Sequence, residues 1–538
     1  MISVFLLYGS AALAVPPDVK YLFPAGGQRA TTVEVAAHGA VSTWPARGWI
    51  NRAGVDATAL GENGKLAIVV CADAVPGIYW LRLHDTTGAS APVPFIVGTL
   101  PEILEVEPNN EPQTPQAVPA SGVVVNGRLV PAGDVDVFAI ELKSGQTLVA
   151  AVEAHELLAS PCDLVLQIVS PRGIVLSQND DERGLDPLLT FAAPIDGTYL
   201  VRLFGFPAAP DTSIALAGAD TFVYRLTLTC GSFLDAALPA AVAQPAAGNI
   251  APSTPSAVVP LGWNLPTDSV TATSVKNGVT QFTLFDPAWA GAVELPVVPH
   301  TVLVEAEPNG AGQPQACLFP ATIGGQIGAP RDVDTFAFTA SKGQSWRFEL
   351  ESRALGYPLD AVLELFDAAG KSLARVDDIA SNADPELSFQ VPADGEYRLS
   401  VSDLFNHGGP RFVYRLRCVP TEADFALTVE AHAFSLAVGA PLEVPLTIER
   451  RNGFAEAIDF EVTGLPEGVT MGAVQSLAGD ESAKSVKLVL SAARGPYSGP
   501  IRIVGRSAGG LERSHAAQTT LSGRGVRTAD LWLTVRDR

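Results

Sequence analysis

An internal duplication constrains the fold of this chain more than any other feature. Five segments return in the same order at a spacing of about 200 residues. The matched pairs are EVEPNN (105–110) with EAEPNG (305–310), GDVDVFAIELKSGQTL (133–148) with RDVDTFAFTASKGQSW (331–346), CDLVLQIVSPRGIVLSQNDD (162–181) with LDAVLELFDAAGKSLARVDD (359–378), IDGTYLVRL (195–203) with ADGEYRLSV (393–401), and FVYRL (222–226) with FVYRL (412–416). Because a unit copied as a whole carries its own core, the pattern predicts two domains of one fold.

The residues inside each copy are typical of short strands. Apolar residues alternate with others at 136–140 and 164–168, and turn signals at 143–145 and 171–173 separate these runs. Gly (49) and Pro (42) are abundant and only 17% of residues are charged, which favours strands joined by turns over long charged helices. We therefore predict an all-β protein, a string of β-sandwich domains in which each copy is one sandwich of about 115 residues.

A chain of 538 residues is too long for one hydrophobic core. The predicted layout has a signal peptide at 1–14, a small Ig-like β domain at 16–100, the first repeat at 101–229, a linker with a small β domain at 232–302, the second repeat at 303–419 and an Ig-like β-sandwich at 424–538. We refer to the parts outside the repeats as the N-terminal domain, the linker domain and the C-terminal domain.

The N-terminal sequence ISVFLLYGSAALAVPP predicts export. Its apolar run ends in Ala12-Leu13-Ala14, which matches the small-residue cleavage site of a secretory signal, so the mature chain is expected to begin near Val15. The run is shorter than the roughly 20 residues that a membrane helix needs, and no later segment predicts a membrane span.

Charge and cysteine content exclude several classes of protein. The chain has 57 Asp and Glu against 35 Lys and Arg, a net charge of −22, and it lacks a basic cluster, so nucleic acid is not expected as a partner. Its five cysteines are odd in number and form no C-x-x-C pair, which argues against a disulfide scaffold or a zinc site. Buried free thiols are predicted. The alternative is pairing of Cys162 with Cys230, or of Cys317 with Cys418, inside one repeat.

The repeated motifs E-x-E-P-N, D-x-D-x-F, a D-D loop, D-G-x-Y and V-Y-R-L resemble the bacterial pre-peptidase C-terminal (PPC) domain. The resemblance covers about 240 residues in two tandem copies, and the flanking segments resemble Ig-like domains. It implies jelly-roll-like sandwiches in a secreted, periplasmic or cell-surface protein of bacteria. It further implies a role in binding matrix or substrate, attachment to secreted proteases, and calcium binding in some members.

The acidic motifs contain oxygen ligands of the kind that calcium prefers. Glu105 and Glu107 are expected on one side of an extended segment, Asn109 adds an amide oxygen, and Asp134 and Asp136 open a strand. By resemblance to calcium-binding members, the predicted ligands are Glu105, Glu107, Asn109 and Asp136, with Asp134 adjacent, and in the second repeat Glu305, Glu307, Asn309 and Asp334, with Asp332 adjacent.

Two positions depart from the calcium-binding pattern. Asn110 and Gly310 stand where such members often carry Asp, and loss of a charged ligand predicts weaker binding, more so in the second repeat. The alternative is that the acidic residues only cap the entry segment through hydrogen bonds. A second acidic group is interpreted as a solvated turn, with metal binding as the alternative. It consists of Asn179, Asp180, Asp181 and Glu182 followed by Asp186, and it recurs as Asp377, Asp378 and Asp384.

The sequence contains no recognisable catalytic motif. It lacks a G-x-S-x-G elbow, a G-x-G-x-x-G loop and a P-loop, and the segment 155–159 begins like H-E-x-x-H but has Ala159 at the second histidine. We therefore predict a non-enzymatic, exported binding or adhesion protein that engages an extracellular protein or polysaccharide and is stabilised by calcium. The alternative is an accessory, non-catalytic component of a secreted peptidase or hydrolase system.

Overall fold

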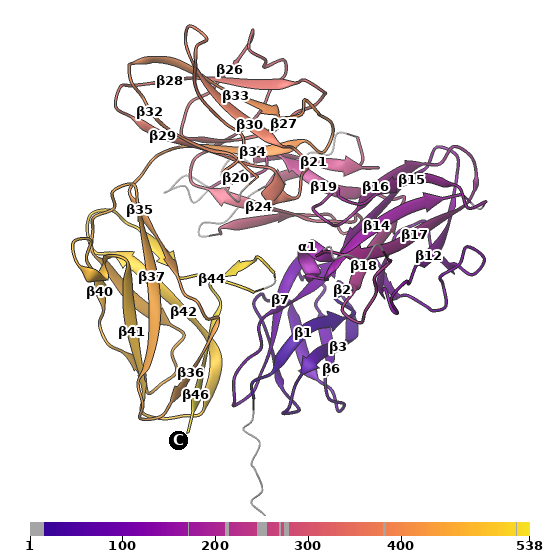
Figure 1. Ribbon diagram of the computed structural model, residues 1–538, viewed down its shortest axis with the longest axis horizontal. Helices are drawn as coiled ribbons and strands as arrows, with labels where there is room; N and C mark the ends of the chain where they lie inside the picture. Colours follow the sequence, from indigo (N-terminus) through magenta and orange to yellow (C-terminus); the bar gives the residue numbers. More distant parts are fainter. Residues whose placement is uncertain are drawn as a thin grey trace, which may run out of the picture.

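The computed structural model describes residues 15–170, 172–209, 215–244, 256–267, 271–273, 279–379, 383–522 and 524–537. These residues form many short β-sheets with almost no helix (Figure 1), which confirms the predicted all-β class. The predicted signal peptide at 1–14 and the segment 245–255 of the predicted linker lie outside the described residues. Within the described ranges, no helix is long and apolar enough to cross a bilayer.

The two repeats have the same topology. In the first repeat the elements are β9 (Glu102–Leu104), β10 (Gln116–Ala117), β11 (Val123–Arg128), β12 (Asp136–Leu142), β13 (Thr147–Glu153), α1 (His155–Leu158), β14 (Cys162–Val169), β15 (Val175–Asn179), β16 (Leu188–Ala192), β17 (Gly197–Pro207) and β18 (Val223–Thr229). They form the sheets β10-β12-β17-β14-β15 and β16-β13-β18-β11-β9.

In the second repeat the elements are β25 (Thr301–Val304), β26 (Gln315–Ala316), β27 (Ala321–Gln326), β28 (Val333–Ala340), β29 (Ser345–Glu351), η1 (Arg353–Leu355), β30 (Ala361–Asp367), β31 (Ser372–Val376), β32 (Glu386–Gln390), β33 (Gly395–Asp403) and β34 (Val413–Pro420). The sheets β26-β28-β33-β30-β31 and β25-β27-β34-β29-β32 repeat the first order strand for strand. Equivalent aromatic residues fill both cores. Phe138 and Tyr224 are fully buried in one repeat, and Phe336 and Tyr414 in the other.

Smaller sheets form the other three parts. The N-terminal domain has β1 (Asp18–Phe23), β2 (Gly26–Gln28), β3 (Thr32–Ala40), β4 (Arg47–Ile50), β5 (Val55–Ala59), β6 (Lys65–Val70), β7 (Gly77–His84) and β8 (Val93–Gly98), in the sheets β1-β3-β6-β5 and β2-β8-β7-β4. The linker domain has β19 (Phe233–Leu238), β20 (Val242–Ala243), β21 (Ser256–Trp263), β22 (Thr271–Thr273), β23 (Gln281–Leu284) and β24 (Val293–Val298), in the sheets β19-β21-β22 and β20-β24-β23.

The C-terminal domain shows plainly why period-2 patterning gives a sandwich. Its elements are β35 (Asp424–Thr428), β36 (Ala433–Ala437), β37 (Leu442–Arg451), β38 (Ile458–Thr463), β39 (Val469–Met471), β40 (Gln475–Ser476), η2 (Glu481–Ala483), β41 (Ser485–Ala492), β42 (Tyr497–Ser507), β43 (Ser514–Ala516), β44 (Thr519–Thr520), β45 (Arg527–Thr528) and β46 (Leu531–Arg536). In β37, Val444, Leu446 and Ile448 are buried between exposed neighbours. Such a strand turns one face to the core and one to water.

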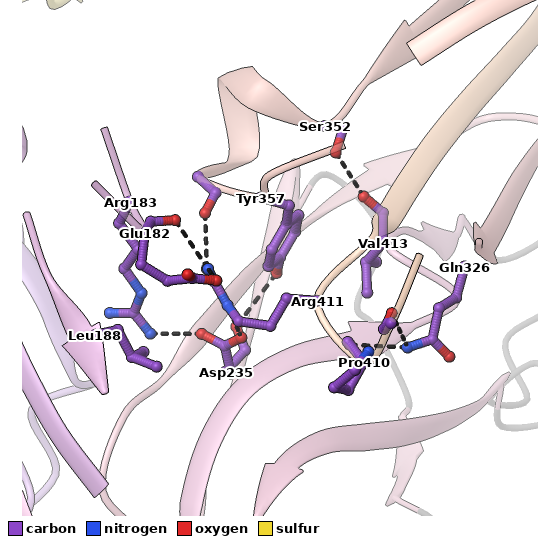
Figure 2. Close-up of polar contacts among 12 residues, drawn as sticks. Glu182, Arg183, Leu188, Asp235, Gln326, Ser352, Tyr357, Pro410, Arg411 and Val413 are labelled. Atoms are coloured by element: carbon purple, nitrogen blue, oxygen red, sulfur yellow. Dashed lines mark hydrogen bonds and ion pairs between the residues drawn. The ribbon is translucent and has the colours of Figure 1, made fainter. Parts of the chain in front are cut away.

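A buried ionic network joins both repeats to the linker domain (Figure 2). Asp235 on β19 accepts hydrogen bonds from Arg183 Nη2 at 2.5 Å and from Arg411 Nε at 2.8 Å. Arg411 also donates to the Glu182 carboxylate at 2.6 Å, and its side chain is only 6% exposed. Burial alone would raise the pKa of Asp235, but Arg183 and Arg411 outweigh it and hold that pKa below its usual value. Arg183 belongs to the first repeat, Asp235 to the linker domain and Arg411 to the second repeat, so the network fixes the repeats against one another.

The described cysteines are all free thiols, so neither alternative disulfide forms. Burial raises the pKa of Cys162 to about 12 and that of Cys317 to about 11. Thiols of this kind are inert packing residues because the thiolate is the reactive form. Cys71 and Cys230 are only partly buried, which differs from the predicted burial of all five.

Candidate metal centre

The acidic residues of each repeat meet where the entry loop crosses the start of a central strand. Glu107 and Asn109 lie in the loop that follows β9, Asp134 lies in the turn before β12, and Asp136 is the first residue of β12. The Val137 amide donates to the Asn109 carbonyl at 3.0 Å, which holds the loop against β12. The second repeat copies this contact, with the Thr335 amide and the Asn309 carbonyl 2.8 Å apart.

Three carboxylates converge in each repeat. One oxygen each from Glu107, Asp134 and Asp136 lie within 4.8 Å of one another, and the second repeat has the same group in Glu307, Asp332 and Asp334. Asn109 and Asn309 are fully buried, and the side-chain amide of each has no hydrogen-bond partner in the described residues. A buried amide without a partner is costly unless something else binds it. The structure thus brings three of the five predicted ligands of each repeat within reach of one another, and it bonds the backbone of the asparagine to the strand that carries the third.

The fifth predicted residue has a different position. Glu105 is not part of the group of three carboxylates. Its Oε1 accepts from the Arg128 amide at 2.8 Å, and its Oε2 lies 3.0 Å from the Tyr224 hydroxyl, which also lies 2.6 Å from Asp136 Oδ2. In the second repeat the Tyr414 hydroxyl links the Glu305 and Asp334 carboxylates at 3.2 and 2.6 Å. In each repeat the tyrosine hydroxyl therefore links the carboxylate of Glu105 or Glu305 to the group of three carboxylates.

Sequence reasoning missed this tyrosine and the glycine beneath it. A Cβ atom at Gly127 would collide with the Tyr224 ring and the Glu105 carboxylate, and one at Gly325 would collide with Tyr414 and Glu305. Only glycine leaves room for the pair at this position. The signal was the tyrosine in FVYRL, a residue with a polar hydroxyl that stands at the same place in both copies.

The electrostatics of the cluster favour a cation. Burial raises the pKa of Asp136, and the nearby Glu105 charge raises it further. Burial also raises the pKa of Glu105, as it does for Glu305 and Asp334 in the second repeat. In the described structure Asp136 Oδ1 and Asp334 Oδ1 have no hydrogen-bond donor. Clustered carboxylates with an amide oxygen form a hard, all-oxygen donor set, which fits calcium.

The two repeats differ at the position after the asparagine. In the first repeat Asn110 Nδ2 donates to Asp134 Oδ1 at 2.5 Å, and Asp134 is 2% exposed. The second repeat has Gly310, which offers no side-chain donor, and Asp332 is only partly buried. Asn110 therefore fixes the orientation of a carboxylate that is held less firmly in the second repeat.

The second acidic group is not simply a solvated turn. Asp186 is 2% exposed and accepts hydrogen bonds from the amides of Ala154, His155 and Glu156 at 2.7–3.1 Å. Its counterpart Asp384 accepts from the amides of residues 352–354. The amides that begin a helical turn have no partner within it, so a buried carboxylate supplies one. The solvated interpretation was wrong for these two residues, while Asp180 and Asp181 are exposed.

Calcium binding is expected to release protons and to strengthen as the pH rises. A metal needs ionised carboxylates, whereas the raised pKa values of Asp136 and Glu105 keep protons on the free site near neutral pH. Each proton released should tighten binding by up to about tenfold per pH unit. Calorimetric titration in buffers of different ionisation enthalpy measures the release, and an enthalpy independent of buffer would contradict this prediction.

Comparison with known proteins identifies part of the chain. Residues 332–403 match the family model of the bacterial pre-peptidase C-terminal domain. The second repeat contains a PPC domain. A probable subtilase-type serine protease of Deinococcus radiodurans is 29% identical over 248 residues, a match that covers 45% of this chain and 26% of the protease. This chain therefore matches only about a quarter of that relative's length.

Solved structures were compared with the whole chain. The PPC domain of collagenase from Bacillus anthracis is 17% identical and covers 19% of this chain and 92% of that domain, with a TM-score of 0.17. The N-terminal four Ig domains of Dscam1 are 12% identical and cover 97% of this chain and 99% of that one, with a TM-score of 0.19. These scores are low, and no functional conclusion follows from them.

Proposed function

We propose that the protein is a non-catalytic, exported bacterial binding protein in which two PPC-type repeats, each stabilised by calcium, engage an extracellular protein or polysaccharide. The duplicated oxygen cluster carries this proposal. Both repeats keep three converging carboxylates and a fully buried, unpartnered asparagine, although much of the surrounding sequence has diverged. In a purely structural cap the side chain would have hydrogen-bond partners. Asp186 is such a cap, because its carboxylate accepts from the backbone amides of residues 154–156.

The histidine contacts support a non-catalytic role. His515 lies 2.7 Å from the Asp424 carboxylate, but in the described part of the chain no hydroxyl or thiol nucleophile bonds to this histidine. His300 lies 2.7 Å from the Thr322 hydroxyl, yet Thr322 is 1% exposed and cannot reach a substrate. A nucleophile, a base and an orienting group must meet at an accessible point for hydrolysis.

A second candidate function is supported by the protease match. The relative that shares 248 residues with this chain is a probable subtilase-type protease, and the matched family is a pre-peptidase domain. The chain would then act beside a secreted peptidase as an accessory component. Affinity capture with the full chain in calcium and in chelator, against matrix proteins, polysaccharides and secreted peptidases of the producing organism, separates the two candidates.

The calcium stoichiometry tests the proposed sites directly. We expect two calcium ions per mature chain, with tighter binding in the first repeat because Asn110 orients Asp134 there. Glu107→Gln should lower the calcium affinity of the tighter site by at least tenfold, and Glu307→Gln should lower that of the weaker site by at least tenfold. Asp196→Asn is the matched control, because this carboxylate is 62% exposed and remote from the cluster. Equal stoichiometry in all four proteins would contradict the assignment.

A further inference from the structure

The two ends of the chain lie against each other. In Figure 1 the C-terminal domain lies beside the N-terminal domain, and side-chain contacts join them. The Trp49 and Trp532 rings meet edge-on at 5.6 Å, and Arg536 donates to the Thr87 carbonyl. Arg524, between β44 and β45, donates to the Lys20 carbonyl at 2.7 Å. The five parts of the chain therefore close into a ring instead of forming an open string.

A fully buried arginine lies at the centre of this contact. Arg82 on β7 is 0% exposed and donates to the carbonyls of Ser90 at 3.0 Å and Asp530 at 2.7 Å. Its third polar contact is His432 Nδ1, at 3.0 Å. Among the described residues no carboxylate lies in salt-bridge contact with Arg82. A buried guanidinium without a counter-ion depends on every acceptor around it.

The histidine at this contact must accept a hydrogen bond. Arginine has only donors, so Nδ1 of His432 presents its lone pair and the ring is neutral, with its proton on Nε2. Protonation would place an N–H against an N–H and a second positive charge 3.0 Å from the first. The Trp532 amide donates to the His432 carbonyl at 3.0 Å, which keeps this residue in place against Arg82.

The surrounding charges do not relieve that repulsion. In the C-terminal domain the Asp530 carboxylate pairs with Arg502 at 2.8 Å. In the N-terminal domain the His84 ring lies 4.7 Å from the Trp532 ring at a tilt of 52°, and burial together with Arg47 lowers the pKa of His84. The Asp85 carboxylate accepts from its own turn. Within the described ranges a protonated His432 therefore has no carboxylate partner.

The interface is also incompletely packed. A cleft of about 560 Å³ opens between the two domains and is lined by Arg47, His84, Asp85, Tyr497 and Ser498 among others. His84 on the wall of this cleft contacts the Trp532 ring, so the cleft borders the domain contact. A contact held by few groups and open to water separates when one of its central hydrogen bonds becomes repulsive.

We propose that the N-terminal and C-terminal domains form an acid-released clasp, in which protonation of His432 beside buried Arg82 opens the ring. Opening would expose the surface that carries Trp49 and Trp532, which the closed ring covers. The clasp lies outside both metal centres, so it does not depend on the proposed calcium sites.

The pH range follows from the sign of the pKa change. Burial and then the charge of Arg82 lower the pKa of His432 from 6.5 to about 4 in the closed ring. Closure is therefore complete above about pH 6.5, weakens as the pH falls, and reaches its minimum near pH 4. Because the His432 imidazole is partly exposed, the equilibrium constant for closure is expected to fall by a factor on the order of 100.

Small-angle X-ray scattering of the full mature chain tests the clasp. The maximum dimension of the wild type should increase between pH 7.5 and pH 4.5. His432→Asn keeps an acceptor for Arg82 but cannot be protonated, so this variant should stay closed at both values. His407→Asn is the matched control, because that ring is 69% exposed, and it should open like the wild type.

A second variant tests whether the charge of Arg82, rather than another effect of acid, opens the ring. Arg82→Met removes the buried cation and leaves burial alone to oppose protonation of His432, so this variant should open less than the wild type at pH 4.5. Near-ultraviolet circular dichroism at pH 7.5 checks that each variant is folded. A wild type of constant dimension, or a His432→Asn variant that opens at the same pH as the wild type, would overturn the proposal.

Discussion

Asp235→Ala is expected to lower the free energy of unfolding by about 3–5 kcal/mol, because it leaves buried Arg411 and partly buried Arg183 without their shared counter-ion. The Asp235 side chain is 5% exposed and lies between Arg183 and Arg411. The corresponding fall in melting temperature is roughly 10 °C, measured by differential scanning calorimetry of the full chain. Asp220→Ala is the control, because its carboxylate is 76% exposed and 3.9 Å from Arg128.

A multiple variant distinguishes a buried charge from a lost contact. Replacing Arg183 and Arg411 with methionine and Asp235 with leucine removes all three charges together. We expect this variant to be more stable than Asp235→Ala alone, since apolar residues of similar size replace a buried ionic group at little cost. If Asp235→Ala behaves like the exposed control, the network does not join the repeats energetically.

Millimolar calcium is expected to raise the melting temperature of the repeats. A ligand that binds only the folded state adds about 2.7 kcal/mol of stability at a hundredfold excess over Kd. Glu107→Gln or Asp136→Asn should abolish most of the rise in the first repeat, and Asp334→Asn the smaller rise in the second. The physical reason is that the cation cancels the repulsion among three carboxylates whose oxygens lie within 4.8 Å of one another.

Calorimetry in calcium and in chelator measures this effect. The exposed Asp196→Asn variant should keep the full response. Identical melting curves under both conditions would mean that the acidic residues act as structural caps, which was the alternative that the sequence left open. Tyr224→Phe adds a further comparison, because it removes the hydroxyl bridge between Glu105 and Asp136 and leaves the group of three carboxylates intact.

Local pattern was sufficient for much of the fold. The alternation at 136–140 predicted a strand, and the structure has β12 there and β28 at the equivalent place in the second repeat. The prediction works because a strand that buries one face needs an apolar residue at every second position. The duplication then required one topology for both repeats, and the structure shows it. The acidic motifs also supply the three carboxylates that converge in each repeat, since the loop that carries E-x-E-P-N is bonded to the strand that D-x-D opens. Their role as metal ligands stays a prediction.

Only the tertiary structure decided how distant residues meet. Glu105 turns to Tyr224 rather than to the other carboxylates, because β18 lies next to β11 and brings the hydroxyl to it. Asp186 is buried because the turn at 154–156 needs an acceptor. Asp235 with Arg411, and Arg82 with His432, pair across 176 and 350 residues. Period and turn chemistry specify a strand and its faces, but the docking of whole domains is set by surfaces that exist only after folding.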